Sequence, residues 1–334
     1  MVKVKEINDF RIIAIKKKEL EVELMNYGAT IYGIKTKDYL GNMQDIVLKY
    51  ENIDDYLNNN IYLNATIGPI AGRVKDAIIK TDDKVYELDK NSDNLHTLHS
   101  GSLALSYKWF DYEVNEEIDY TEVVFLYEEE ELVNYQVKVI YRVFDNKIEV
   151  MFEVDTDQDF VFNLTNHAYF NLSGNLSSNI RDHQVLLNSD LRHELNDELV
   201  ITGKVIKENG IYNFKDKQDL NLVIKELEKT PKGGVDDIYY FPNNDLRHAM
   251  AVVYEPLSNR MMKVRSSYDH LVFYTHNNIN DLELKHLGKH KWHYALCFEC
   301  QKSPYGFKDK DCSNPLLKKN QTYQEKIIFE FSIK

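Results

Sequence analysis

The stretch Asn163 to Gly174, NLTNHAYFNLSG, surrounds one titratable side chain with short, uncharged polar groups. If this stretch is a strand, successive side chains point to opposite faces. One face would then carry Asn163, Thr165, His167, Tyr169 and Asn171. The opposite face is apolar except for Asn166. Amide, hydroxyl, imidazole and phenol groups suit a neutral, polyhydroxylated ligand such as a sugar. His167 can exchange a proton near neutral pH, although a buried histidine bonded to a carbonyl is the plainer interpretation.

Glu299 is the second candidate for proton transfer, because it lies in the apolar stretch Ala295 to Gln301, ALCFECQ. On a strand, Cys297, Glu299 and Gln301 share one face, and the residues between them are apolar. A carboxylate in such a segment is costly unless it is used or paired. Glu299 is therefore either a functional base or the partner of an Arg or Lys on a neighbouring strand.

Three further segments carry candidate ligand-binding side chains. Arg73 ends the turn-like sequence GPIAGR, where a guanidinium could hold oxygens that develop negative charge. His99 lies in LHSG, with His96 as a weaker competitor, and Asp236 lies in GVDD. A surface arginine, a solvated loop histidine and a pair of turn aspartates are the corresponding alternatives without function.

NHAYFNL closely resembles the signature of the aldose 1-epimerases (galactose mutarotases), and the other segments resemble that family's motifs in the same order. The resemblance extends from NYGATI at Asn26 to ECQ at Glu299. It implies that His167 is the general acid for the sugar ring oxygen and Glu299 the general base for the anomeric hydroxyl. It also implies that Arg73, His99 and Asp236 bind a monosaccharide, with no cofactor and no metal.

Several positions depart from the family pattern and leave the preferred sugar open. The departures are Gly72 for Asn, Ser100 for Gly, Asp237 for His, Val272 for Gln, Cys300 for Thr and Tyr305 for Asp. Three alternatives therefore stay open. One is a relative that acts on a phosphorylated or otherwise modified sugar, and another is a non-catalytic sugar-binding module. The third is a glycoside hydrolase that pairs Glu299 with Asp236.

The totals restrict the class of protein. A net charge of −13 among 334 residues argues against nucleic acids and anionic membranes as partners, because phosphate binding needs clustered Lys and Arg. No apolar run approaches the length of about 18 residues that a membrane span needs, and the N-terminus has no signal-like apolar core. Three cysteines do not form a disulfide framework. We expect a soluble, cytoplasmic protein.

Alternating apolar residues predict many short strands, which include 20–24, 26–34, 45–48, 135–144, 147–154 and 325–333. Asp145-Asn146 is a tight-turn pair and predicts a hairpin. Helical periodicity is confined to residues 219–229 and a single turn near residues 54–57. The chain is thus predicted to be all-β, a large antiparallel β-sandwich in one domain over residues 1–334. The family resemblance implies a galactose mutarotase-like super-sandwich with its sugar site in a groove on one sheet.

Two other patterns receive functional interpretations that the sequence does not favour. His286, His290 and His293 have the spacing of a helical metal face, but Gly288 interrupts the segment. Cys297 and Cys300 form a CxxC pair, yet redox pairs of that kind open a helix and these lie in a predicted strand. We interpret them as reduced residues of the core or pocket.

Overall fold

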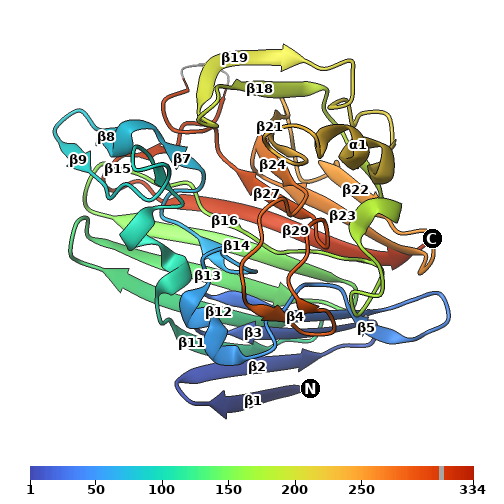
Figure 1. Ribbon diagram of the computed structural model, residues 1–334. Coiled ribbons are helices and arrows are strands. Elements are labelled where there is room, and N and C mark those ends of the chain that lie inside the picture. The colour runs from blue at the N-terminus through green and yellow to red at the C-terminus, as the bar shows by residue number, and fades with distance from the viewer. Residues whose placement is uncertain (308–311) are drawn as a thin grey trace.

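The computed structural model describes residues 1–307 and 312–334, and almost all of its regular structure is antiparallel β-sheet (Figure 1). The N-terminal strands form a five-stranded sheet in chain order. Its strands are β1 (Val2–Ile7), β2 (Phe10–Lys16), β3 (Leu20–Met25), β4 (Thr30–Lys37) and β5 (Met43–Asp45). This sheet lies at the bottom of Figure 1.

A nine-stranded sheet forms the centre of the molecule and joins strands from both halves of the chain. In spatial order its strands are β11 (Asp111–Glu116), β12 (Thr121–Glu129), β13 (Tyr135–Val143), β14 (Lys147–Thr156), β29 (Tyr323–Ile333), β23 (Arg260–Ser266), β22 (Ala251–Tyr254), β17 (Gln184–Leu187) and β20 (Gln218–Asp219). The last long strand therefore pairs with β14 from the middle of the chain.

A second five-stranded sheet carries most of the chemistry discussed below. Its spatial order is β19 (Ile201–Lys207), β18 (Leu191–Leu195), β21 (Asp236–Tyr240), β24 (His270–Tyr274) and β27 (Cys297–Gln301). The β18–β19 hairpin stands at the top of Figure 1, and β24 and β27 run toward the middle of the molecule.

Short strand pairs and helical turns complete the described structure. The pairs are β6 (Thr66–Ile67) with β16 (Thr165–Asn166), β7 (Arg73–Val74) with β10 (Thr97–Leu98), β8 (Ile78–Lys80) with β9 (Val85–Glu87), β15 (Phe160–Val161) with β28 (Leu316–Leu317), and β25 (Glu283–Leu284) with β26 (Gly288–Lys289). The helices are α1 (Leu220–Leu227) and the short 3-10 turns η1 (Ile53–Asn58), η2 (Lys75–Ala77), η3 (Gly101–Leu103), η4 (Leu105–Tyr107) and η5 (Ile180–Asp182).

The strand patterns explain why the chain folds into sheets. On β12, β13 and β14, alternate side chains such as Val123, Phe125, Val137 and Phe152 are fully buried in one continuous core. On β13 the intervening residues Gln136, Lys138 and Arg142 are polar and partly exposed, as expected for a sheet with one covered face. The predicted all-β, antiparallel architecture is thus confirmed.

The predicted hairpin and helix are also confirmed. Strands β13 and β14 pair from Val143↔Ile148 outward, around the Asp145-Asn146 turn. Helix α1 begins after Asp219, whose carboxylate accepts a hydrogen bond from the backbone N–H of Asn221 at 3.0 Å and caps the helix. None of the helices in the described residues has the length and apolar character needed to cross a lipid bilayer.

The prediction for residues 163–174 was too simple. Only Thr165 and Asn166 form a strand. Asn163 and Phe170 take part in isolated bridges, and residues 172–174 form a turn. Every residue from Asn163 to Gly174 is nevertheless buried. The predicted strand is thus present only at Thr165 and Asn166, and alternation did not indicate that both faces of the segment are covered.

Candidate active site

The register of β21, β24 and β27 arranges pocket-facing side chains in rows across the sheet. Ile238, Val272 and Glu299 are direct cross-strand partners and form the central row. Side chains alternate between faces along each strand. Asp236, two residues before Ile238 on β21, and Gln301, two residues after Glu299 on β27, therefore lie on the same face as the central row. The prediction that Cys297, Glu299 and Gln301 share a face of a strand is confirmed. The side chains between them, such as that of Phe298, lie in the core on the opposite face.

His167 approaches Glu299 from the extended segment that borders β27. Asn64 holds this segment on the C-terminal side of the histidine. Its backbone N–H donates to the carbonyl of His167 at 3.1 Å, and its Oδ1 accepts from the N–H of Tyr169 at 2.9 Å. The amide of Asn64 also donates to the carbonyl of Leu48 at 2.6 Å. The backbone that carries the imidazole is thus bonded to a fully buried asparagine.

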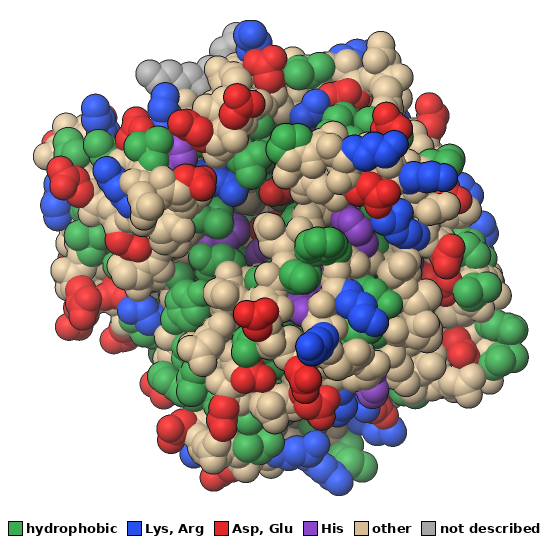
Figure 2. Space-filling view, viewed as in Figure 1, with side chains coloured by type: hydrophobic (Ala, Val, Ile, Leu, Met, Phe, Trp, Pro, Cys, Tyr) green, Lys and Arg blue, Asp and Glu red, His purple; other side chains and the backbone are tan. Residues whose placement is uncertain are grey.

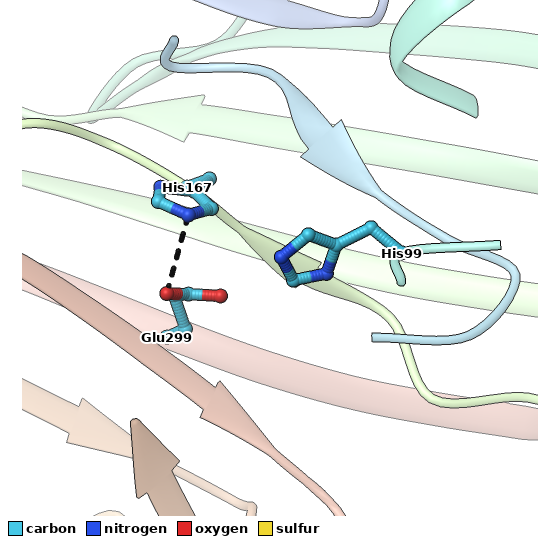
Figure 3. A group of neighbouring side chains, drawn as sticks. All are labelled: His99, His167 and Glu299. Carbon is cyan, nitrogen blue, oxygen red and sulfur yellow. Dashed lines mark ion pairs between the residues drawn. The ribbon is translucent and has the colours of Figure 1, made fainter. Parts of the chain in front are cut away.

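The imidazole of His167 and the carboxylate of Glu299 meet at the bottom of the site. His167 Nε2 lies 3.3 Å from Glu299 Oε1, and the two residues are 6% and 3% exposed (Figure 3). Burial lowers the pKa of His167 to about 4. Burial, together with the charge of Asp236, raises the pKa of Glu299 well above its ordinary value, and only Arg73 opposes this shift. The two shifts disfavour the imidazolium of His167 and the carboxylate of Glu299 when either charge is unpaired. The pair is therefore most stable when the two side chains share one proton.

His99 faces this pair from a tight turn between β10 and η3. The N–H of Gly72 donates to His99 Nδ1 at 3.2 Å, so the hydrogen of the neutral ring is on Nε2. His99 packs edge-to-face against His167, with ring centroids 5.7 Å apart. This geometry makes His99 a hydrogen-bond donor toward the pocket. Burial, then His167 and Arg73, holds its pKa well below the ordinary value.

Arg73 and Asp236 place opposite charges at the edge of the same pocket. Arg73 Nε is buried without a hydrogen-bond partner among the described residues, which leaves it available to a ligand oxygen. Burial raises the pKa of Asp236, and the neighbouring guanidinium of Arg73 opposes this shift. Arg73 is also the only cationic Lys or Arg side chain among the described residues that line the pocket.

The five predicted site residues, Arg73, His99, His167, Asp236 and Glu299, all line one pocket. The face shown in Figure 2 is hollowed near its centre, with histidine side chains at the bottom of the hollow. The other lining residues, which were not assigned to the site from the sequence, include Tyr62, Tyr169, Tyr274 and Gln301. The Oε1 atom of Gln301 is buried without a partner among the described residues, so it is a further acceptor facing the ligand space.

The two ambiguous choices between neighbouring residues are resolved by geometry. His96 is not among the lining residues. Its Nδ1 accepts from the N–H of Asp76 at 3.0 Å, and its Nε2 lies 3.3 Å from Glu198. Asp237 is fully buried in ion pairs with Arg192 at 2.8 Å and Lys232 at 2.7 Å. Asp236 and His99 are therefore the pocket residues.

Other departures from the family pattern lie away from the ligand space. Ser100 exchanges hydrogen bonds with the backbone of Ile70, at 2.8 and 3.1 Å, and so supports the turn that carries His99. Cys300 lies in the core beside Met250, and the hydroxyl of Tyr305 bonds to the backbone of Lys80. Among the departures considered, Gly72 and Val272 line the pocket itself.

The candidate metal patterns have different roles in the structure. His286, His290 and His293 do not lie on a helix, and their partners are Asp45, His276 and the carbonyl of Thr275, respectively. Ligand atoms of His99, His167 and Glu299 lie within 4.8 Å of one another. However, the Gly72 N–H occupies Nδ1 of His99, so its Nε2 can coordinate a metal only after a tautomer change that loses this bond.

Comparison with known proteins agrees with this fold and site. The sequence model of the aldose 1-epimerase family matches residues 11–330. The galactose mutarotase of Homo sapiens is 27% identical over 94% of this chain and 92% of its own length. The aldose 1-epimerase of Streptococcus thermophilus is 28% identical, with 93% and 90% covered. These features define the class as an antiparallel β-sandwich with a buried histidine–glutamate pair in one pocket. The chain belongs to the aldose 1-epimerase family.

Solved structures show the same fold. A GalM/aldose epimerase homologue from C. elegans superimposes with a TM-score of 0.85 at 22% identity, covering 96% of this chain and 98% of the other. Galactose 1-epimerase from Lactobacillus acidophilus gives a TM-score of 0.82 at 18% identity, with 100% and 98% covered. The predicted galactose mutarotase-like super-sandwich is confirmed.

Proposed function

We propose that this chain is an aldose 1-epimerase that interconverts the α and β anomers of a free monosaccharide, with Glu299 and His167 as its catalytic residues. The observation that carries the proposal is the buried pair with 3.3 Å between His167 Nε2 and Glu299 Oε1. Family membership supports the reaction, and the geometry supports the residue roles. An acid and a base that flank one small pocket are what ring opening of a cyclic hemiacetal needs.

The reaction is a pair of proton transfers. Glu299 removes the proton from the C1 hydroxyl while His167 donates a proton to the ring oxygen. The C1–O5 bond breaks and leaves an aldehyde at C1 and a hydroxyl at C5. Rotation about the C1–C2 bond presents the other face of the aldehyde. Reversal of the two transfers then closes the ring as the other anomer, so the pair regains its original protonation state.

The surrounding residues bind and orient the sugar. Arg73 and the Nε2–H of His99 donate hydrogen bonds to sugar oxygens, and Asp236 accepts hydrogen bonds from sugar hydroxyls. Arg73 also opposes the rise in the pKa of Glu299, so it favours the carboxylate that acts as the base. A phosphorylated sugar is a poorer ligand for this pocket, because no further Lys or Arg among the described residues lines it.

We further propose that a single domain spans residues 1–334 and that the protein is cytoplasmic. Strand β29, near the C-terminus, pairs with β14 and β23 inside the nine-stranded sheet, which supports one cooperative unit. The buried cysteines Cys297 and Cys300 are free thiols, which supports a reducing compartment.

Polarimetry with freshly dissolved α-D-glucose and α-D-galactose tests the function. The wild-type chain is expected to accelerate equilibration of the anomers. Glu299→Gln is expected to reduce the acceleration by at least about 10²- to 10⁴-fold, the usual contribution of one acid or base. Glu113→Gln, on the exposed part of β11, is the matched control and is expected to retain full activity. Sugar binding by the wild type without acceleration would instead identify a non-catalytic binding module.

A further inference from the structure

The imidazole of His167 is stacked on the ring of Tyr169. The two ring centroids are 4.9 Å apart and the ring planes differ by 13°, which is an offset-stacked arrangement. Tyr169 is 2% exposed and His167 is 6% exposed, so the contact is shielded from water. The ring of Tyr62 is also nearly parallel to the imidazole, at a centroid distance of 6.5 Å and an angle of 22°. The proposed acid therefore packs against the aromatic face of a neighbouring tyrosine.

Hydrogen bonds hold Tyr169 through its backbone and through its hydroxyl. The backbone N–H donates to Asn64 Oδ1 at 2.9 Å, and the hydroxyl donates to the carbonyl of Ile61 at 2.8 Å. Burial keeps the pKa of Tyr169 well above its ordinary value, so the phenol is uncharged throughout the pH range in which His167 titrates. His167 thus meets a fixed, neutral aromatic face.

The proposed reaction requires a positive charge on His167. To donate a proton to the ring oxygen, this side chain must be an imidazolium while Glu299 is a carboxylate. Burial opposes this arrangement, because it lowers the pKa of His167 and, together with the charge of Asp236, raises the pKa of Glu299. The shared proton therefore lies mostly on Glu299 in the resting pair. Any contact that favours the imidazolium increases the fraction of the pair that can react.

An aromatic face provides such a contact. The electrons above the ring plane attract a cation, so an imidazolium gains more from the stack than a neutral imidazole does. The attraction is strongest where water is excluded, as it is between these two rings. An attraction of this kind changes a protonation equilibrium by about 2- to 30-fold. An aliphatic side chain of similar volume would fill the same space and lack this effect.

We propose that Tyr169 is a positioning residue that favours the proton-donating form of His167 through its neutral aromatic face. This inference rests on the proposed function, because it assigns a role to a neighbour of the proposed acid. The alternative is a structural role, in which Tyr169 is one more ring of the buried cluster that contains Tyr50 and Tyr56. The two roles depend on different properties of the ring, since packing depends on its shape and the proposed role depends on its electrons.

Several other titratable side chains surround His167, and most of them are neutral. Glu299 lies at its Nε2, and the rings of His99 and Tyr274 make edge-to-face contacts at centroid distances of 5.7 and 6.2 Å. Burial holds the pKa of His99 well below its ordinary value and raises the pKa values of Tyr274 and Tyr62, so these three side chains are uncharged near neutral pH. The more distant groups are Arg73 and Asp236 at the pocket edge and His276, which contacts Tyr169. Glu299 is therefore the group in direct contact that exchanges charge with His167.

Fluorinated rings test the inference, because fluorine withdraws ring electrons and leaves the shape of the ring almost unchanged. Tyr169→Phe keeps the aromatic face, and phenylalanine analogues with one, three or five ring fluorines at this position weaken its attraction for a cation stepwise. The values of kcat and KM are measured by polarimetry with D-glucose and D-galactose. We expect kcat to fall with each step, by about 2- to 30-fold in total, and KM to stay within about twofold of its value in Tyr169→Phe.

Tyr169→Leu removes the aromatic face altogether and provides a second measurement. The acid limb of the kcat/KM profile reports the uptake of a second proton, which charges His167 when Glu299 already holds a proton. Without the ring this uptake is less favourable, so the limb is expected to move to lower pH by about 0.4 to 1.5 units, whereas Tyr169→Phe leaves it in place. The same fluorinated series at Tyr112, a half-buried tyrosine of β11 outside the pocket, is the matched control and is expected to leave kcat unchanged.

A kcat that stays constant across the fluorinated series would overturn the inference, even if Tyr169→Leu is inactive or unfolded, because packing alone would then explain the loss. A rise in KM at constant kcat would also overturn it, since the ring would then act by contact with the sugar. So would an acid limb that stays in place in folded Tyr169→Leu. If the wild type accelerates anomer exchange and Glu299→Gln does not, the proposed function stands whatever the series shows. If the wild type accelerates neither sugar, the proposed function fails and this inference fails with it.

Discussion

Asn64→Ala is expected to destabilise the protein strongly, because Asn64 bonds two buried backbone groups through its side chain. The carbonyl of Leu48 and the N–H of Tyr169 would each lose their bond to the asparagine, at about 1–3 kcal/mol per buried group. Asn64 also has a φ of 58°, a left-handed conformation that costs an alanine about 1 kcal/mol. Together these losses lower the free energy of unfolding by about 4 kcal/mol.

Urea unfolding, followed by tryptophan fluorescence, measures this loss. Asn243→Ala is the matched control, because Asn243 has a φ of 61° but is exposed. It is expected to lose about 1 kcal/mol or less. Asn64→Gly loses the same side-chain hydrogen bonds but adopts the positive φ without strain, so it is expected to lose about 3 kcal/mol. The reasoning is refuted if Asn64→Ala is no less stable than Asn243→Ala.

The same substitution has a predicted effect on catalysis. The side chain of Asn64 accepts from the N–H of Tyr169, two residues after His167, so its loss is expected to displace the proposed acid relative to Glu299. We expect kcat to fall by more than KM rises, measured by polarimetry at a temperature where the variant is folded. An unchanged kcat in the folded variant would show that the segment keeps its position without Asn64.

Three further predictions concern charge. The alkaline limb of the kcat/KM profile reports the loss of the proton that His167 and Glu299 share. The charge of Asp236 helps to raise the pKa of Glu299, so Asp236→Asn is expected to move this limb to lower pH. A limb that moves to higher pH contradicts this. His290 is neutral in the folded state until about pH 4, because burial lowers its pKa, whereas unfolded histidine binds a proton below about pH 6.5. It therefore lowers the free energy of unfolding by about 1.4 kcal/mol per pH unit as the pH falls from 6.5 to 4; urea titrations that give equal stability at pH 7 and 5 would refute this. Asp237→Ala removes the ion-pair partner of Lys232 and one of the two ion-pair partners of Arg192, and it is expected to cost about 3 kcal/mol in urea unfolding, with kcat/KM within about threefold of wild type. Lost activity without lost stability would instead place Asp237 in the site.

The sequence predicts elements that are specified locally. The Asp145-Asn146 turn and the apolar alternation on either side specify the β13–β14 hairpin, and Asp219 specifies the start of α1. The segment around His167 was predicted less well. Its backbone bonds to residues that are distant in the chain, such as Ala65 for the N–H of His167 and Ile46 for that of Asn171. Apolar periodicity reports which side of a segment is covered, but not which distant backbone it bonds to.

The residues of the candidate site were likewise predicted only in part. The five residues that carry recognisable motifs, from Arg73 to Glu299, converge on one pocket. The β18–β19 hairpin, whose Leu199 and Val200 line the pocket, was not assigned to the site, because these two residues resemble ordinary core residues in the sequence. The choice between His96 and His99 depends on the turn, where His99 and Ser100 have positive φ values of 49° and 72°. Such a conformation cannot be inferred from a spacing of three residues.

Side chains on β21, β24 and β27 alternate between the core and the pocket, and this determines which mutations the strands can tolerate. Tyr239, Leu271, Phe273, Phe298 and Cys300 point into the core, while Ile238, Val272 and Glu299 face the ligand. Substitutions at every second position can therefore alter what is bound while the packing beneath stays intact. A single-residue insertion or deletion in β27 has the opposite effect, because it turns the carboxylate into the interior and a phenylalanine into the cavity. We expect substitutions to persist on these strands and length changes to be confined to the loops between them.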